Sequence, residues 1–128
     1  MTPFGPQLIG ETEKLLTALL HRALEGTGLT ERHWVCLRLA QQANGDLATT
    51  VQERAQFPEA VRLVADLAER GLLADDRLTA AGRELVATVQ ERITATTAPL
   101  WADLPAEETR AAARALATVR DRARALLS

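Results

Sequence analysis

The sequence contains little of several residue types that many proteins depend on. Among its 128 residues there is one cysteine and no tyrosine, and aromatic residues make up only 3%. The single cysteine, Cys36, excludes a disulfide within the chain and is typical of a protein from a reducing compartment. With so few aromatic residues, the core must be filled by leucine, valine and alanine.

The sequence also lacks any long apolar run. It has no stretch of about 18 apolar residues and no basic segment followed by an apolar one near its start, so we expect neither a membrane span nor a secretory signal. It has no phosphate-binding glycine loop, no nucleophile motif and no dense cluster of histidine and cysteine. The sequence therefore predicts a cytoplasmic protein with no catalytic residue, cofactor, metal site or membrane partner.

Charge of one sign is not in excess. The net charge is −2, and of the 15 basic residues only Lys14 is lysine. This balance argues against a chain that coats nucleic acid by bulk electrostatics, although a local basic patch is compatible with it. Apolar residues make up 47%, and abundant alanine, leucine, arginine and glutamate favour helix. The length suits a single domain over residues 1–128.

Apolar spacing and capping signals divide the chain into six helices and one short hairpin. The predicted helices begin at or just after Pro6, Thr30, Asp46, Pro58, Thr79 and Pro105. We expect Thr30, Asp46 and Thr79 to cap their helices and Pro58 to lie in the first turn of the fourth helix. The first four end before Gly26, near Gln42, at Gln56 and at Gly71, and Asn44-Gly45-Asp46 reads as a turn. Two very short strands around Asp75-Asp76 predict a hairpin.

The predicted fourth helix has a broad apolar side and a charged side. The apolar side holds Ala60, Val61, Leu63, Val64, Ala65, Leu67 and Ala68. The charged side holds Glu59, Arg62, Asp66, Glu69 and Arg70. We expect the apolar side to face the core and the charged side to face solvent.

The first and last helices carry more apolar surface than a small chain can bury by itself. The first shows two adjacent apolar stripes and the last keeps a three-four spacing, so we predict a homodimer joined by terminal helices over about residues 6–25 and 80–127. The candidate dimerisation residues are Leu8, Leu15, Leu16, Leu19, Leu116, Val119, Ala123 and Leu126.

In element order and in three segments, the chain resembles the MarR family of bacterial transcription regulators over essentially its whole length. The segments are LTERHWV at residues 29–35, LVADLAERGLL at 63–73 and LTAAG at 78–82. The resemblance implies a mainly α winged helix-turn-helix, with that motif and its wing at about residues 30–79. It also implies an obligate homodimer that binds double-stranded DNA, with the fourth helix in the major groove and the hairpin at the minor groove.

Mapped onto this sequence, the resemblance gives six candidate DNA-binding residues: Thr49, Thr50, Arg54, Arg62, Arg70 and Arg77. Two features oppose this role. The wing is only residues 72–77 and turns at Asp75-Asp76, and residues 46–77 hold four basic against seven acidic residues, a net charge of −3. Because phosphate neutralisation supplies much of DNA affinity, an alternative stays open, namely a dimeric interaction or ligand-binding module that has lost DNA binding.

The resemblance further implies a small aromatic effector, bound between the dimerisation helices and the DNA-binding lobe. His21, His33, Trp34 and Arg38 are the candidate pocket residues. The alternative for Trp34 is that it packs in the core. Cys36 likewise has two interpretations, a peroxide-sensing thiol or a small buried hydrophobic residue, and its position between Val35 and Leu37 favours the second.

Overall fold

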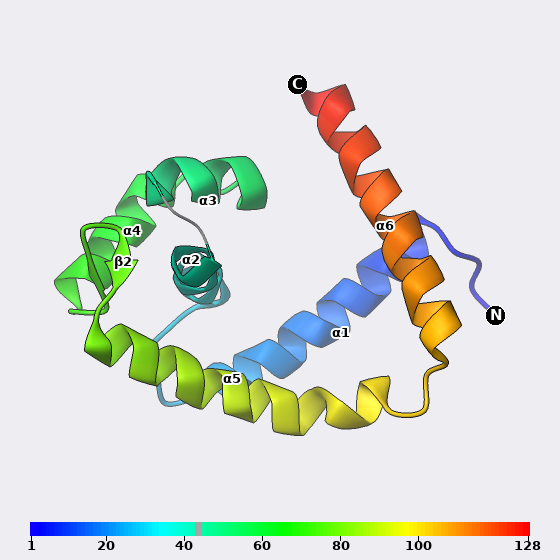
Figure 1. Ribbon diagram of the computed structural model, residues 1–128, viewed down its shortest axis with the longest axis horizontal. Coiled ribbons are helices and arrows are strands. Elements are labelled where there is room, and N and C mark those ends of the chain that lie inside the picture. Colours follow the sequence, from blue (N-terminus) through cyan, green and yellow to red (C-terminus); the bar gives the residue numbers. More distant parts are fainter. Residues whose placement is uncertain (43–44) are drawn as a thin grey trace. The chain divides into compact units, whose positions relative to one another are not determined.

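The computed structural model describes residues 1–42 and 45–128, which form two compact units, residues 1–96 and 97–128. In chain order the elements are α1 (Pro6–Leu24), α2 (Glu31–Gln42), α3 (Leu47–Ala55), α4 (Ala60–Glu69), β1 (Leu73–Ala74), β2 (Arg77–Leu78), α5 (Ala80–Trp101) and α6 (Ala106–Leu127) (Figure 1). This order confirms the predicted mainly α winged helix-turn-helix. Asn44 of the predicted turn at Asn44-Gly45-Asp46 lies outside the described residues.

Two of the predicted helix caps are present. At the start of α2, Oγ1 of Thr30 accepts a hydrogen bond of 3.2 Å from the backbone N–H of His33. At the start of α5, Oγ1 of Thr79 accepts one of 3.0 Å from the backbone N–H of Gly82. Each bond satisfies an N–H group that has no partner within its own helix. Local sequence therefore determines where these two helices begin.

The core of the first unit is built around α2. This helix contacts α1, α3, α4 and β2, and its Leu37 is fully buried together with Val51 of α3 and Leu67 of α4. From α5, Val86 and Val89 complete the same cluster. The core therefore consists mainly of aliphatic side chains, as the scarcity of aromatic residues predicts.

Trp34 and Cys36 both belong to this core. Trp34 is only 6% exposed and packs within the cluster, and Cys36 has no exposed surface. Burial, with a smaller contribution from the charge of Glu59, raises the pKa of the Cys36 thiol to about 11. Because only the thiolate is strongly nucleophilic, the interpretation of Cys36 as a small buried hydrophobic residue is confirmed.

The predicted hairpin is also present. β1 and β2 pair antiparallel, with Leu73 opposite Leu78 and Ala74 opposite Arg77. Between them, Asp75 and Asp76 have φ values of 51° and 63°, the left-handed conformation that a tight two-residue hairpin turn requires at both positions. Aspartate enters this region more readily than most residues, so an acidic turn without glycine can still close.

Asp76 has a structural role at the start of α3. Its Oδ2 accepts a hydrogen bond of 3.2 Å from the backbone N–H of Leu47, 29 residues earlier in the chain. Asp46 stands at the N-cap position, but its side chain does not cap α3. Instead its carboxylate accepts a hydrogen bond of 2.8 Å from the hydroxyl of Thr49. The predicted cap at Asp46 is therefore replaced by one from the tip of the hairpin.

Two expectations about α4 are wrong. The helix begins at Ala60, after a turn that includes Pro58, so Pro58 is not in its first turn. Its apolar side is also narrower than expected, because the core covers only one strip of the helix. Ala60 and Leu67 are buried and Leu63 and Val64 half-buried, whereas Val61, Ala65 and Ala68 are exposed.

A close approach of the backbone requires Gly82 near the start of α5. A Cβ atom at this position would collide with the carbonyl oxygen of Leu72. The same oxygen accepts a hydrogen bond of 3.1 Å from the backbone N–H of Thr79. The glycine therefore lets α5 leave the hairpin in close contact with the segment that enters it.

Terminal helices leave apolar side chains uncovered in both units. In the second unit α6 has no buried residue along its described length, and Leu126 is 87% exposed. In the first unit Leu15 of α1 is 69% exposed, while Leu8, Leu16 and Leu19 are half-buried. Over the described residues, none of the helices combines the length and the apolar character that a membrane span needs.

Candidate nucleic-acid interface

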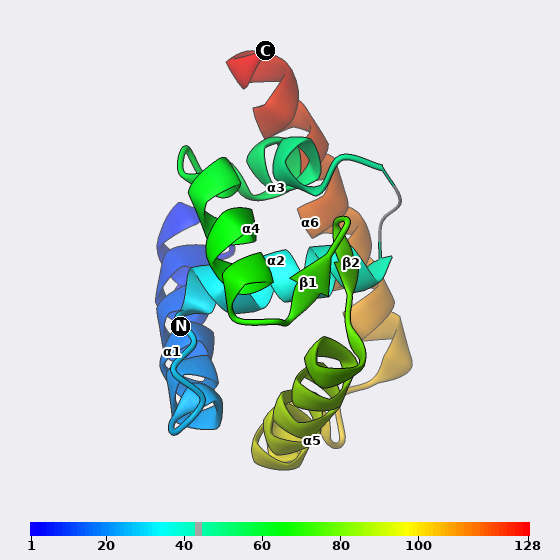
Figure 2. The same ribbon diagram turned by 90° about the vertical axis from the view of Figure 1, so that its left-hand side faces the viewer.

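α3 and α4 form a helix-turn-helix, and the hairpin follows directly. Figure 2 shows α4 and the hairpin side by side on one face of the first unit, and α4 contacts β1. On α4, the exposed residues are Val61, Arg62, Ala65, Ala68 and Glu69. This face of α4, with the hairpin beside it, is the candidate interface.

Glu59, just before α4, is held by an arginine from α2. Its carboxylate forms an ion pair with the guanidinium of Arg32, and that guanidinium also lies 4.5 Å from the centroid of the Phe57 ring. A hydrogen bond from its own backbone N–H, and then the one from Arg32, hold the pKa of Glu59 below its ordinary value. The charge of Glu59 is therefore partnered within the protein.

Asp66, in the middle of α4, has two partners. Its Oδ2 lies 2.7 Å from Nε2 of His33 and 3.1 Å from the guanidinium of Arg70. Arg70 also donates a hydrogen bond of 2.8 Å to the carbonyl oxygen of Gly28. Burial alone would raise the pKa of Asp66, but the bonds from His33 and Arg70 and the charge of Arg70 together lower it.

The hydrogen bonds of His33 assign the proton on its ring. Nδ1 lies 3.1 Å from the backbone nitrogen of Thr30, whose N–H donates to it. Nδ1 is thus an acceptor, so the proton sits on Nε2 and is donated to Asp66. His33 is buried and joins the start of α2 to the middle of α4. This bridge holds the angle between the two helices.

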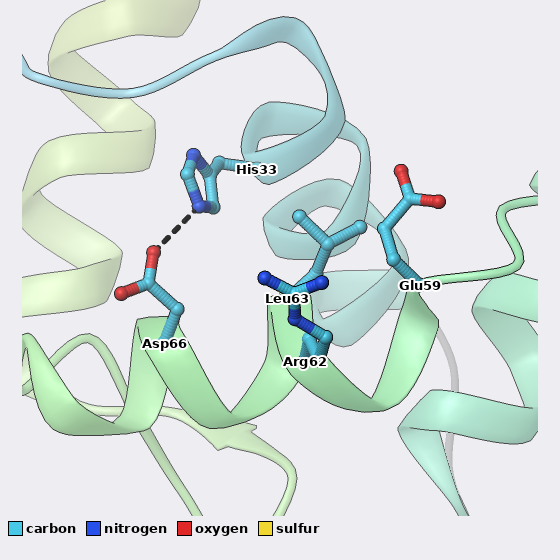
Figure 3. A pocket seen from close by; sticks show the side chains of 5 residues that line it. All are labelled: His33, Glu59, Arg62, Leu63 and Asp66. Carbon is cyan, nitrogen blue, oxygen red and sulfur yellow. Dashed lines mark hydrogen bonds and ion pairs between the residues drawn. The ribbon is translucent and has the colours of Figure 1, made fainter.

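Between α2 and α4 lies an open hollow of about 430 Å³. It is lined by His33, Glu59, Arg62, Leu63 and Asp66, and in Figure 3 a dashed line joins His33 to Asp66 across it. Within the described residues no three side chains of histidine, cysteine, aspartate or glutamate come together to hold a metal ion. The hollow is therefore lined by the paired side chains of Glu59, His33 and Asp66, together with Arg62, which has no ion pair among the described residues.

The net charge of −3 over residues 46–77 overstates the repulsion that DNA would meet. Four of the seven acidic side chains accept a hydrogen bond or form an ion pair within the protein: Asp46, Glu59, Asp66 and Asp76. In the part of the chain that the structure describes, no ion pair or hydrogen bond engages the side chains of Arg54, Arg62 and Arg77. Three cations therefore remain available, against three unpartnered acids.

The other three candidate DNA-binding residues already make contacts within the protein. Thr49 donates to the carboxylate of Asp46, and Thr50 donates a hydrogen bond of 3.0 Å to the Asp46 carbonyl oxygen. Arg70 is held by Gly28 and Asp66, so it positions α4. Arg62 lies on α4, Arg54 on α3 and Arg77 on β2, so the three available cations come from three different elements.

The candidate ligand residues do not all converge. Arg38 donates a hydrogen bond to the side-chain oxygen of Gln90, and its guanidinium lies 5.9 Å from the centroid of the Trp34 ring. His33 is turned to Asp66 instead, and His21 is exposed on α1. The structure thus brings Trp34 and Arg38 together. Gln90 had no sequence signal, since it lies 52 residues from Arg38.

Comparisons with known proteins agree with this architecture. No family model and no curated protein matches the sequence, but solved structures do. A MarR family protein of Mycobacterium tuberculosis, solved in complex with DNA, is 27% identical, with a TM-score of 0.72 over 93% of this chain and 98% of that chain. A transcriptional regulator of the MarR family from Rhodococcus is 24% identical, with a TM-score of 0.73 over 88% of both chains.

The Mycobacterium tuberculosis protein is also similar in a second solved structure. Its complex with salicylic acid is 26% identical to this chain and has a TM-score of 0.68 over 93% of this chain and 99% of that one. Each of these likenesses extends over most of both chains. The matched residues therefore include the terminal helices as well as the helix-turn-helix.

Proposed function

Because the chain has the winged-helix fold of the MarR-family transcription regulators, we propose that it is a homodimeric regulator that binds double-stranded DNA. A similar protein of the same fold was solved in complex with DNA. The observation that carries the proposal is the internal pairing of Glu59, Asp66 and Asp76. This pairing leaves Arg54, Arg62 and Arg77 available for phosphate.

In the proposed complex α4 enters the major groove. Arg62, on its exposed face, contacts a guanine or a phosphate, because the guanidinium fork suits both. Arg54 and Arg77 hold the phosphate backbone on either side, and Thr49 and Thr50 add hydrogen bonds after exchanging their contacts with Asp46. The strands of the hairpin have only two residues each, so the wing contributes little to binding in the minor groove.

Fluorescence anisotropy tests DNA binding directly. The protein is titrated with its own upstream DNA and with duplexes that it selects from a random library, over a range of salt concentrations. We expect specific binding that weakens as salt rises, because bound phosphates release counterions. Feeble association that ignores sequence would contradict the proposal and support the alternative, a dimeric module without DNA binding.

Arg62→Ala tests the main contact. If Arg62 contacts a guanine, we expect the substitution to weaken operator binding by about 1–3 kcal/mol. Arg22→Ala is the matched control, since it removes the same charge from an exposed position on α1. Equal affinities of the Arg62 and Arg22 variants would remove the assigned role of Arg62.

A second copy of the chain is proposed to cover the terminal helices. Leu15, Leu116 and Leu126 are exposed on helices where heptad-like spacing predicts a partner. Sedimentation equilibrium over a wide concentration range tests this proposal. We expect a dimer, and a folded single copy at high concentration would contradict both the dimer and the paired reading of DNA.

A small aromatic acid is the proposed effector. The similar Mycobacterium tuberculosis protein was solved with salicylic acid, and in this chain Arg38 supplies a cation beside the ring of Trp34, with His21 and His33 as further candidates. Bound effector would release DNA by moving one lobe against another. Calorimetry with salicylate measures the binding. We expect Arg38→Ala to weaken it and Arg22→Ala to leave it unchanged.

A further inference from the structure

The outward face of α4 is apolar along its middle. Val61 is 71% exposed, and Ala65 and Ala68 follow it at helical spacing and are exposed as well. Arg62 and Glu69 flank them. A helix that reads DNA by hydrogen bonds presents polar side chains to the base edges, and this one presents methyl groups instead.

Three of the five charged residues in α4 or next to its ends cannot fill that role, because they are engaged elsewhere. Asp66 and Arg70 are bonded to each other and to residues of α2 and the loop before it. Glu59 is paired with Arg32. Among the described residues, Arg62 and Glu69 are the two charged residues of α4 whose side chains have no ion pair or hydrogen bond.

Val61 stands where base contacts are made. It is the second residue of α4, and in a helix-turn-helix the first residues of the second helix approach the base edges. From residue 61 to residue 68 a helix rises about 10 Å, which corresponds to roughly three base-pair steps. The apolar strip therefore matches the length of a short recognition element in the major groove.

We infer that α4 reads thymine, by contact of Val61 and Ala65 with the C5-methyl group in the major groove. The methyl is the one apolar group on a base edge in that groove. Arg62, beside the strip, supplies the positive charge that draws the helix to the negatively charged backbone. This inference rests on the proposed DNA binding and adds the chemical basis of its sequence preference.

Uracil-substituted DNA tests the inference, because uracil lacks only the C5-methyl and keeps every hydrogen-bonding group of thymine. Duplexes that the protein selects from a random library are made with uracil at the thymines of the recognised half-sites. We expect affinity to fall about fourfold for each contacted methyl that is lost. The control duplex carries the same number of uracils in its flanks and should bind like the unmodified DNA.

Two variants test whether Val61 is responsible for the loss of affinity for uracil-substituted DNA. Val61→Ala, at an exposed position where alanine is a better helix former, should weaken binding to thymine DNA and respond much less to uracil. Arg62→Ala should weaken binding to both DNAs by the same factor. If wild-type protein bound thymine and uracil duplexes equally, or if Val61→Ala kept full affinity, the inference would be wrong while the proposed function stands. If the protein selected no duplex at all, the result would contradict the proposed DNA binding and, with it, the inference.

Discussion

In the helix-turn-helix lobe, residues 30–79, Leu37, Val51 and Leu67 have no exposed surface, whereas α6 contains leucine and valine and buries none of its residues. The two regions use similar aliphatic side chains. The core of the lobe is covered because α1, α3, α4 and β2 pack against α2 and because Val86 and Val89 of α5 complete the cluster. In α6, Leu116, Val119 and Leu126 are exposed. Burial therefore distinguishes a region whose aliphatic side chains are covered from a helix whose aliphatic side chains are exposed.

The charged groups of the two regions differ in the same way. In the lobe, Glu59 and Asp66 are bonded to residues 27 and 33 positions earlier in the chain. In α6 the ion pair is between neighbours, Arg120 and Asp121, and both side chains are exposed. An exposed pair of neighbours contributes little stability. The pairs in the lobe instead connect separate helices and hold α4 in place.

The largest expected effect is the loss of a core side chain. Leu37→Ala should lower the free energy of unfolding by about 2–5 kcal/mol, because it leaves a cavity in a fully buried site. Urea denaturation at several protein concentrations measures the loss, which should be the same at each concentration. Leu126→Ala is the control, and its effect should depend on concentration. A Leu37→Ala protein as stable as the wild type would contradict the assignment of this core.

The next effect concerns α6. Leu116→Glu should raise the dissociation constant of the proposed dimer by more than about tenfold, because burying a leucine stabilises by about 1.5–3 kcal/mol and a buried charge is costly. Analytical ultracentrifugation measures the shift. Thr118→Glu adds the same charge to an exposed position outside the apolar stripe. If both variants remained dimeric, the apolar stripe of α6 would not be the interface.

A smaller effect is expected at the tip of the hairpin. Asp76→Gly removes the carboxylate that caps Leu47, whereas Asp75→Gly removes one with no partner among the described residues. Both changes relieve a left-handed backbone conformation equally. The Asp76 variant should therefore be the less stable of the two, by about 1 kcal/mol. Thermal denaturation compares them, and equal stabilities would show that the cap contributes nothing.

The smallest effect is on the dependence of stability on pH. The pKa of Asp66 in the folded protein is lowered from 3.8, so its contribution to stability is present above that value and is lost as pH falls further. As pH falls from 5 to the value at which the protein unfolds, the free energy of unfolding should decrease less for Asp66→Asn than for the wild type. Urea midpoints across this range measure the slopes. Asp75→Asn is the control, and an equal slope for both variants would contradict the role of Asp66.

Much of the architecture could be predicted from local signals. Thr30 and Thr79 cap the helices that they were expected to cap, and Asp75-Asp76 closes the expected hairpin. Each signal acts over three or four residues, so one sequence is enough to detect it. The resemblance to the MarR family rested on the order of such elements, and the similar solved structures confirm the fold.

The character of the candidate interface could not be predicted in the same way. A count of charges over residues 46–77 treats every acidic residue as repulsive, although Arg32 and His33, which partner Glu59 and Asp66, lie outside that stretch. The apolar residues of α4 cover more than half of its circumference, so periodicity alone does not say which of them the core covers. In the structure the core does not cover Val61, whose side chain is exposed.

By itself the sequence determined the presence of the helices, the starts of α2 and α5, the aliphatic nature of the core and the excess of apolar surface on the terminal helices. These depend on propensities and caps that act within a turn or two of the chain. Only the tertiary structure decided which acids are neutralised, that Asp76 caps α3 and that α4 turns a valine outward. Those outcomes depend on which side chains come into contact when distant segments pack. Interactions within a few residues of the chain do not determine these contacts.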